Sequence, residues 1–155
     1  MDQYRGNRVA VILPCYNEAP AIASVVAGFR AALPEAAIYV FDNASTDTTA
    51  EVARAAGATV ISVTHRGKGN VVRRMFADVE ADIYLMADGD GTYDPDAARQ
   101  MIDTLLAGGL DMVVGCRVAS GSGEYRFGHK VGNRALTRAV ARIFGDGFTD
   151  MLSGY

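Results

Sequence analysis

Cysteine and histidine are scarce in this chain of 155 residues, which has two of each. Cys15 and Cys116 lie far apart, each at the end of an apolar run, and the sequence contains no CxxC pair. This spacing argues against a disulfide and against a zinc site. Two lone thiols are typical of a reducing cytoplasm, and we expect both to be small buried hydrophobic residues.

Long apolar runs and an excess of basic residues are also lacking. No run approaches the ~20 apolar residues of a membrane helix, and residues 1–8 lack the apolar core of a signal peptide. A net charge of -3 argues against nucleic acid as a partner, because that function needs a basic face. We therefore expect a cytoplasmic protein, and leave open peripheral attachment at the inner face of the cell membrane and homo-oligomer formation.

Short β-branched runs alternate with helical patterns along the chain. Strands are predicted at 9–13, 38–41, 59–63, 83–87 and 112–114, and helices at 20–33, 46–56, 70–79, 96–107 and 128–144. We expect Ser45 and Thr46 to cap the second helix. The alternation predicts an α/β fold with a mostly parallel sheet and helices on both faces. We expect one domain over 1–155, and the abrupt end at Tyr155 suggests a piece of a longer protein.

Polar residues gather directly after the predicted strands. They are Asn17 and Glu18, Asp42 and Asn43, the run 67–70, Asp88 and Asp90, and Arg117. In an open α/β sheet, ligands bind outside the carboxyl ends of the strands. The five clusters therefore predict a single cleft at one edge of the sheet.

Asp88-Gly89-Asp90 places two carboxylates on a tight turn. At ~4 Å their repulsion would be roughly 4 kcal/mol in a medium of dielectric ~20, and a divalent cation relieves it. Carboxylate oxygens favour Mg²⁺ or Mn²⁺ bridged to a diphosphate, whereas a solvated acidic turn is the plainer alternative. An EF-hand is excluded because its sixth and twelfth positions would be Tyr93 and Arg99.

The usual nucleotide-binding loops are absent. The turn after the first strand, residues 14–18, has no glycine, so the dinucleotide fingerprint fails, and no P-loop is present. Asp42 nevertheless occupies the place of the acid that holds a ribose in dinucleotide-binding folds. The cleft therefore suits a nucleotide held by other means.

Five motifs together resemble the family 2 glycosyltransferases of GT-A fold, and most closely the polyprenyl-phosphate (dolichyl-phosphate-type) sugar synthases. They are Pro14-Cys15-Tyr16-Asn17-Glu18, Asp42-Asn43-Ala44-Ser45-Thr46-Asp47, Gly67-Lys68-Gly69-Asn70, Asp88-Gly89-Asp90-Gly91-Thr92-Tyr93 and Gly115-Cys116-Arg117. The resemblance covers essentially the whole chain. It implies a Rossmann-like GT-A catalytic domain that uses a UDP- or GDP-sugar.

The resemblance also implies roles for individual residues. Glu18 and Asp42 would contact the base and ribose, in a pocket shaped by Pro14, Tyr16 and Asn17, with Lys68 near the nucleotide. Asp88 and Asp90 would engage Mg²⁺ or Mn²⁺ and the diphosphate. Arg117 would bind an acceptor phosphate, and Asp150 falls where such enzymes carry a short acidic motif.

Two acceptors remain open at this point. An ionised lipid phosphate needs no general base, whereas a glycan hydroxyl would need one, for which Asp150 is the candidate. Single displacement would invert the anomeric centre. Arg134, Arg138 and Arg142 form either a solvated face or a stripe toward anionic lipid. A nucleotidyltransferase lacks support, because residues 14–18 have no Gly-rich basic loop, and a non-catalytic sugar-nucleotide-binding module stays open.

Overall fold

The computed structural model describes residues 3–115. The chain divides into two compact units, Met1–Val113 and Val114–Tyr155, and the elements below belong to the first. The strands are β1 (Val9–Cys15), β2 (Ala37–Asp42), β3 (Thr59–Ser62) and β4 (Ile83–Met86). The helices are α1 (Ala19–Ala32), α2 (Thr49–Ala55), α3 (Lys68–Asp78) and α4 (Ala97–Gly108).

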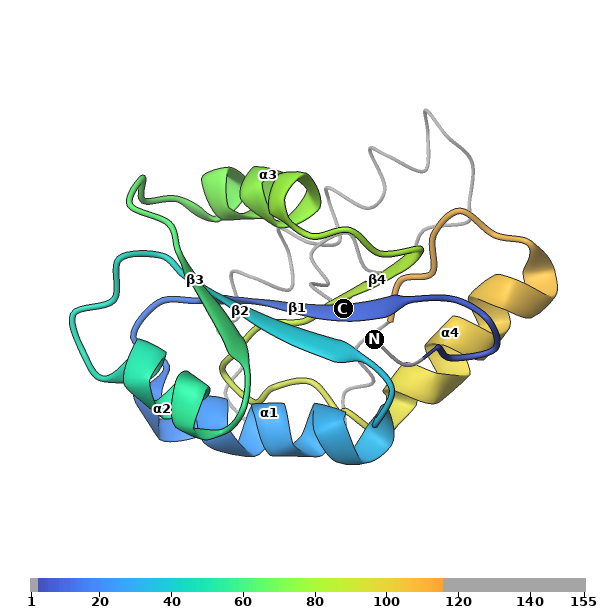
Figure 1. The fold of residues 1–155 in the computed structure, drawn as a ribbon, viewed down its shortest axis with the longest axis horizontal. Coiled ribbons are helices and arrows are strands. Elements are labelled where there is room, and N and C mark those ends of the chain that lie inside the picture. The colour runs from blue at the N-terminus through green and yellow to red at the C-terminus, as the bar shows by residue number, and fades with distance from the viewer. Residues whose placement is uncertain (1–2, 116–155) are drawn as a thin grey trace, which may run out of the picture. The chain divides into compact units, whose positions relative to one another are not determined.

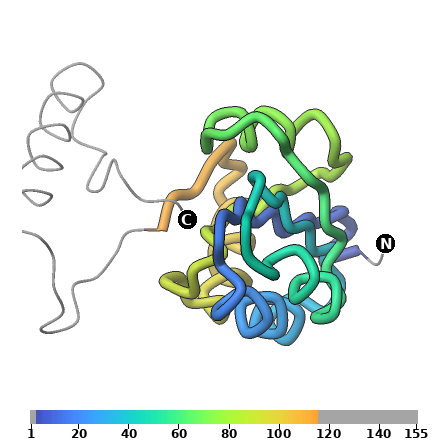
Figure 2. Tube along the Cα trace, turned by 90° about the vertical axis from the view of Figure 1, so that its left-hand side faces the viewer, coloured from blue at the N-terminus to red at the C-terminus, as the bar shows by residue number. Residues whose placement is uncertain are grey.

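The four strands form one parallel sheet in the order β3-β2-β1-β4. Helices α1 and α2 lie below this sheet and α3 lies above it (Figure 1), and the same layers are seen after a quarter turn (Figure 2). β1 is central and covered on both faces, so six of its seven residues are buried. This explains its nearly continuous apolar sequence.

Helices α1 and α3 each pack through one apolar stripe. In α1, Ile22, Val25, Val26 and Phe29 recur at helical spacing and are all buried. On the opposite face of the sheet, Val71 and Met75 of α3 join a core cluster whose other buried members are Ala10, Ile12, Phe41, Val63 and Val79. The predicted helices covering both faces are therefore present.

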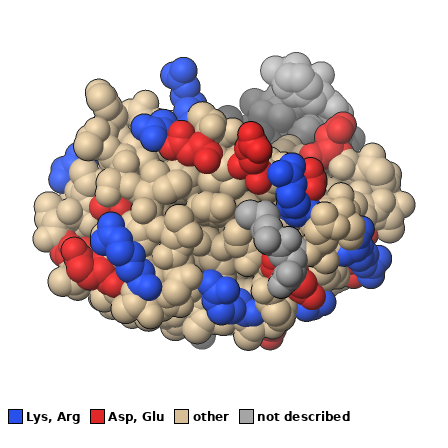
Figure 3. Space-filling model, viewed as in Figure 1, with Lys and Arg blue, Asp and Glu red and all other residues tan. Residues whose placement is uncertain are grey.

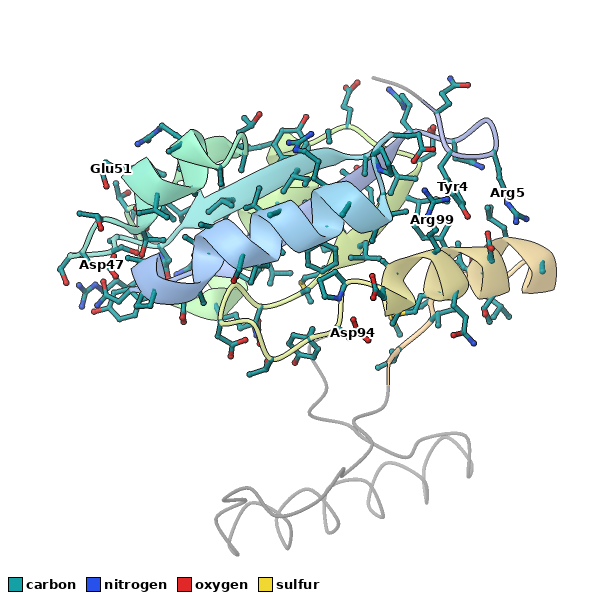
Figure 4. The ribbon with its side chains drawn as sticks, turned by 90° about the horizontal axis from the view of Figure 1, so that it is seen from below. Tyr4, Arg5, Asp47, Glu51, Asp94 and Arg99 are labelled. Carbon is teal, nitrogen blue, oxygen red and sulfur yellow. The ribbon has the colours of Figure 1, made fainter. Side chains whose placement is uncertain are left out.

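The N-terminal turn is fastened to α4 at one end of this unit. The Tyr4 hydroxyl donates a hydrogen bond to Asp103 at 2.9 Å, and Arg5 pairs with the same carboxylate at 3.2 Å. The Arg99 guanidinium lies 5.4 Å from the Tyr4 ring centre. Figure 4 shows Tyr4, Arg5 and Arg99 together at this end. These contacts lie apart from the loops that carry the predicted site.

Two sequence predictions about local structure are wrong. Residues 112–114 form no strand, and Met112 and Val114 are 72% and 45% exposed. A run of three apolar residues does not by itself distinguish a buried strand from an exposed segment. Helix α2 begins at Thr49 rather than Thr46, because the polar groups of Ser45 and Thr46 bond to Asn17 across the sheet edge.

Several predicted features fall outside the described residues. They are the helix at 128–144, Cys116, Arg117, Asp150 and the arginines at 134, 138 and 142.

Within residues 3–115, no helix has both the length and the apolar character required to cross a membrane. On the face shown in Figure 3, Lys and Arg side chains lie among Asp and Glu side chains.

Candidate functional site

The strand order changes direction at β1. From β1 the chain proceeds outward through β2 and β3, and then returns to place β4 on the other side of β1. A crevice at such a switch point is where open α/β sheets bind ligands.

A cavity of about 420 Å³ lies at this point. Four segments contribute to it: the end of β1 with the loop that follows, the residue after β2, the start of α3 with the residues before it, and the turn after β4. Its lining comprises Pro14, Cys15, Tyr16, Glu18, Asn43, Arg66, Gly67, Lys68, Val71, Asp88, Gly89 and Asp90. The predicted convergence of polar clusters at one edge is therefore present for the loops that the structure describes.

Six of the predicted site residues line this cavity: Pro14, Tyr16, Glu18, Lys68, Asp88 and Asp90. Asn17 and Asp42 do not. Arg117 and Asp150 lie outside the described residues. The roles assigned to these residues from the sequence remain predictions.

The Glu18 side chain is not needed to cap α1, because other residues accept hydrogen bonds from the backbone N–H groups at the start of this helix. Glu18 precedes the helix but makes no side-chain capping bond. Its backbone N–H donates to the Thr49 hydroxyl at 2.8 Å, and the Ala19 N–H donates to the Asp47 carboxylate at 3.2 Å. Figure 4 shows Asp47 at the beginning of α1. The loop after β2 thus caps α1, which leaves the Glu18 carboxylate available to a ligand.

Asn17 braces the same two loops. Its backbone is left-handed, with φ of 57°, a conformation that asparagine tolerates better than most residues. Its side-chain oxygen accepts the Thr46 N–H at 2.8 Å, and its own N–H donates to the Ser45 hydroxyl at 3.0 Å. Asn17 does not line the cavity itself, and these bonds hold the loop after β1 against the loop after β2.

Asp42 is buried at the end of β2, with 8% of its surface exposed. One carboxylate oxygen accepts the Ser45 N–H at 3.3 Å. The carboxylate therefore helps to fold the loop that caps α1. A nucleoside contact by Asp42 is still a prediction.

Asn43 was not singled out as a site residue in the sequence, yet it organises one wall of the cavity. Its amide donates to the carbonyls of Val63 and His65 at 3.0 and 2.8 Å, and its side-chain oxygen accepts the Gly67 N–H at 2.8 Å. Only 8% of its surface is exposed. The signal for it was its position directly after Asp42, at the carboxyl end of a predicted strand.

Arg66 is a second lining residue that the sequence reasoning missed. Its guanidinium lies 5.0 Å from the centre of the Tyr16 ring, within cation–π range. Tyr16 is 44% exposed. The pair forms a flat aromatic and cationic surface at the cavity, of a kind on which a planar base can stack.

Carboxylates crowd the other part of the cavity. Burial raises the pKa of Glu18, and the charges of Asp90, Asp47 and Asp88 raise it further. Burial raises the pKa of the Cys15 thiol to about 12, with contributions from Glu18, Asp42, Asp88 and Asp90. Cys15 is therefore an un-ionised buried residue, as its sequence context predicted, and the acidic groups surround it.

The turn after β4 holds its two carboxylates differently. Asp90 accepts the N–H and the hydroxyl of Thr92, at 2.9 and 2.7 Å, which fixes the turn. Asp88 pairs with the Lys68 ammonium at 2.5 Å. Gly89 between them is buried against Cys15, where a Cβ atom would meet the sulfur.

These residues fit a divalent cation that is shared with a substrate. Within residues 3–115, no three His, Cys, Asp or Glu side chains are grouped as a complete metal site. Mg²⁺ and related ions, however, commonly take one or two carboxylates and fill their remaining positions with water and substrate phosphates. Asp88 and Asp90 could supply such a partial set of oxygen ligands, and a cation there would offset the negative charges of Asp90, Asp47 and Asp88 that raise the pKa of Glu18.

Comparison with known sequences identifies relatives over most of the chain. The family described as Glycosyl transferase family 2 matches residues 10–151. Protein RfbJ of Shigella flexneri is 60% identical over 128 residues, which cover 82% of this chain and 99% of RfbJ. Glycosyltransferase AglJ of Haloferax volcanii is 43% identical over 149 residues, covering 95% of this chain and 48% of AglJ. The dolichyl-phosphate hexose transferase of the same organism is 30% identical over 154 residues, which cover 99% of this chain and 67% of that enzyme.

The fold also matches solved structures. Glucosyl-3-phosphoglycerate synthase from Mycobacterium tuberculosis, solved with Mn²⁺ and UDP-glucose, aligns with a TM-score of 0.73 at 28% identity. The alignment covers 97% of this chain and 55% of that one. The chain thus spans about half the length of this enzyme and of AglJ. The GT-A fold predicted from the sequence is confirmed.

Proposed function

The chain belongs to glycosyl transferase family 2, and on that premise we propose that it moves a sugar from a UDP- or GDP-sugar to a polyprenyl phosphate, with inversion and with a divalent metal. The observation that supports this most directly is the cavity at the β1/β4 switch point. It combines an aromatic and cationic surface with a cluster of carboxylates. A nucleotide sugar presents a planar base and a diphosphate, which match these two features.

Donor binding divides between the two features of the cavity. Tyr16 and Arg66 offer the surface for the base, and Glu18, whose carboxylate is left free by the capping of α1, hydrogen-bonds to the nucleoside. Pro14 and Asn17 shape this region, and Asp42 supports the ribose from the end of β2. Lys68 supplies positive charge for the diphosphate.

Asp88 and Asp90 would hold the Mg²⁺ or Mn²⁺. When bound, such an ion neutralises charge that develops on the departing nucleoside diphosphate. The Asp90 turn is already fixed by its two bonds from Thr92, so this ligand is preorganised. A related enzyme has been solved with Mn²⁺ and UDP-glucose, which supports the use of a divalent metal but does not bear on which residues hold it.

The acceptor assignment rests on similarity to a dolichyl-phosphate hexose transferase. An oxygen of the lipid phosphate attacks the anomeric carbon, and the bond from that carbon to the donor's β-phosphate oxygen breaks, so the nucleoside diphosphate leaves with the electron pair. Because the attacking oxygen is already ionised near pH 7, no residue has to remove a proton. Arg117 binds the acceptor phosphate, and a lipid acceptor implies work at the inner face of the cell membrane.

A glycan hydroxyl is the alternative acceptor. Its proton would have to be removed during attack, and Asp150 is the candidate base. Loss of transfer in Asp150→Asn with a hydroxyl acceptor, but not with a lipid phosphate, distinguishes the two acceptors.

The test of the donor site is a thermal-shift panel of UDP- and GDP-sugars, with Mn²⁺ or with excess EDTA. A ligand at 100 times its Kd stabilises the folded state by roughly 2.7 kcal/mol. We expect this gain with Mn²⁺ and not with EDTA. Asp90→Asn should lose the metal-dependent part, whereas Asp111→Asn, an equal charge change outside the cavity lining, should keep it. Equal stabilisation in EDTA would contradict the metal bridge.

Transfer itself is measured with a labelled donor and a short polyprenyl phosphate. Label extracted with the lipid supports the proposal, and the anomeric configuration of the product tests inversion. Tight donor binding with neither transfer nor hydrolysis would indicate a non-catalytic binding module instead.

A further inference from the structure

The Lys68–Asp88 pair lies inside the cavity that the proposed function assigns to the donor. The ammonium nitrogen is 2.5 Å from one Asp88 oxygen. Both side chains retain access to solvent, at 55% and 27% exposure, so neither is locked in the core. A cation therefore already occupies a carboxylate that a metal ion would need.

The placement of Lys68 is not explained by helix stability. Lys68 is the first residue of α3, and no acidic residue lies in the first turn of that helix. A positive side chain at a helix N-terminus opposes the helix dipole. What Lys68 gains at this position is its contact with Asp88, 20 residues away in sequence.

Asn43 fixes the backbone segment that positions Lys68. Its three side-chain bonds, to Val63, His65 and Gly67, fix both ends of the segment that leads from β3 into α3. Gly67 is the residue immediately before Lys68 and has φ of 122°, a conformation that favours glycine. With Gly67 tied to Asn43, the position of the Lys68 backbone follows.

We propose that Lys68 is a built-in counter-ion that occupies Asp88 until metal and donor arrive, and that Asn43 is the positioning residue that places it there. This inference rests on the proposed function, because it takes Asp88 as a metal ligand. Lys68 and the metal compete for one carboxylate in the donor-free protein. Once the metal is bound, the ammonium is released toward the diphosphate, so Lys68 opposes metal binding alone but favours binding of metal and nucleotide together.

The first experiment is a titration of the donor-free full chain with Mn²⁺, followed by the EPR signal of free Mn²⁺. Exposed ion pairs contribute about 0.2–1 kcal/mol, so Lys68→Met should tighten Mn²⁺ binding roughly 1.4- to fivefold. Arg73→Met is the matched control: it removes one positive charge from the same helix at a residue that does not line the cavity. An equal gain in Arg73→Met, or no gain in Lys68→Met, overturns the counter-ion role.

The second experiment measures UDP and GDP binding at saturating Mn²⁺ by calorimetry. Lys68→Met should weaken binding of the better nucleotide by about tenfold, while it tightens Mn²⁺ alone. Opposite changes in one variant are not produced by general damage to the pocket. If both affinities change in the same direction, Lys68 does not exchange between Asp88 and the diphosphate.

The role of Asn43 is tested by combining variants. Asn43→Ala should tighten Mn²⁺ binding as Lys68→Met does, and the double variant should gain no more than Lys68→Met alone, because Asn43 acts through Lys68. Asn70→Ala, which removes one amide bond to the Arg66 carbonyl, is the control and should leave Mn²⁺ affinity unchanged. Asn43→Ser serves if the alanine variant does not fold. Additive effects, or weaker Mn²⁺ binding in the Asn43 variants, overturn its positioning role.

Failure of this inference is separable from failure of the proposed function. If the wild-type protein binds a UDP- or GDP-sugar with Mn²⁺ but Lys68→Met leaves the Mn²⁺ affinity unchanged, the inference is overturned and the proposed function stands. Wild type that binds no nucleotide sugar with or without metal overturns the proposed function, and the inference with it.

Discussion

The hydroxyl oxygen of Thr49 accepts the backbone N–H of Glu18 at 2.8 Å, across 31 residues of sequence. Thr49 is fully buried, and its own hydroxyl hydrogen goes to the Asp47 carboxylate. A single buried side chain therefore links the start of α1, the start of α2 and the residue whose carboxylate faces the cavity. The Thr49 hydroxyl therefore contributes both to the stability of the fold and to the geometry of the site.

Replacing Thr49 with valine should lower the free energy of unfolding by about 1–3 kcal/mol, because the Glu18 N–H loses its partner in a partly buried place while the side-chain volume is kept. Urea denaturation measures this change. Thr49→Ser keeps the hydroxyl and should lose less. A valine variant as stable as wild type would mean that the Glu18 N–H finds another acceptor.

Asp47 should make stability depend on pH in the acidic range. The Thr49 hydroxyl and the N–H groups of Thr49 and Ala19 hold the pKa of Asp47 below its ordinary value of 3.8. A lowered folded-state pKa contributes stability above the ordinary value, and that contribution is lost as pH falls through the lowered pKa. The difference in unfolding free energy between wild type and Asp47→Asn should therefore be constant near pH 6 and shrink below 3.8. A difference that stays the same on acidification would contradict this.

Glu18 should show the opposite dependence. Its pKa is raised above 4.5 by burial and by the charges of Asp90, Asp47 and Asp88. The neutral form is therefore favoured in the fold, and stability is lost as pH rises through the raised pKa. Glu18→Gln should be more stable than wild type at pH 7 and no more stable below pH 4.5. Urea denaturation at pH 7 and below pH 4.5 measures this difference in stability. An equal gain in stability at both pH values would mean that ionisation of Glu18 is not its cause.

Gly89 should not tolerate even one methyl group. An alanine Cβ would collide with the Cys15 sulfur beneath the turn, so Gly89→Ala should cost about 1–3 kcal/mol and displace Asp88 and Asp90. The second variant Cys15→Ala removes the sulfur and leaves the Cys15 Cβ at 3.6 Å, an ordinary contact.

The double variant Gly89→Ala with Cys15→Ala should therefore be more stable than the sum of the two single changes, and should regain Mn²⁺-dependent donor binding. Thermal unfolding with and without donor measures both effects. Purely additive losses would mean that the sulfur is not what excludes a side chain at position 89.

The helices and strands were more predictable from the sequence than the contacts between loops. The central strand and the helix stripes follow from local patterning, because burial on both faces of β1 or on one face of α1 imposes a fixed period on the apolar residues. The absence of a strand at 112–114 was not predictable in this way. Three apolar residues carry too little periodicity, and these residues are solvent-exposed or partly exposed outside any strand.

The sequence by itself determined which residue types reach the ligand edge of the sheet, since every parallel strand ends there and Glu18, Lys68, Asp88 and Asp90 follow strands. Only the tertiary structure decided how those residues are used. Ser45 and Thr46 have the chemistry of helix caps, but the loop after β1 lies within hydrogen-bonding distance and takes their polar groups. Asn43 and Arg66 acquire their roles from partners 20 to 50 residues away, Val63 and Tyr16 among them. Such contacts depend on which loops the crossing order of the strands brings together, and local sequence does not encode that order.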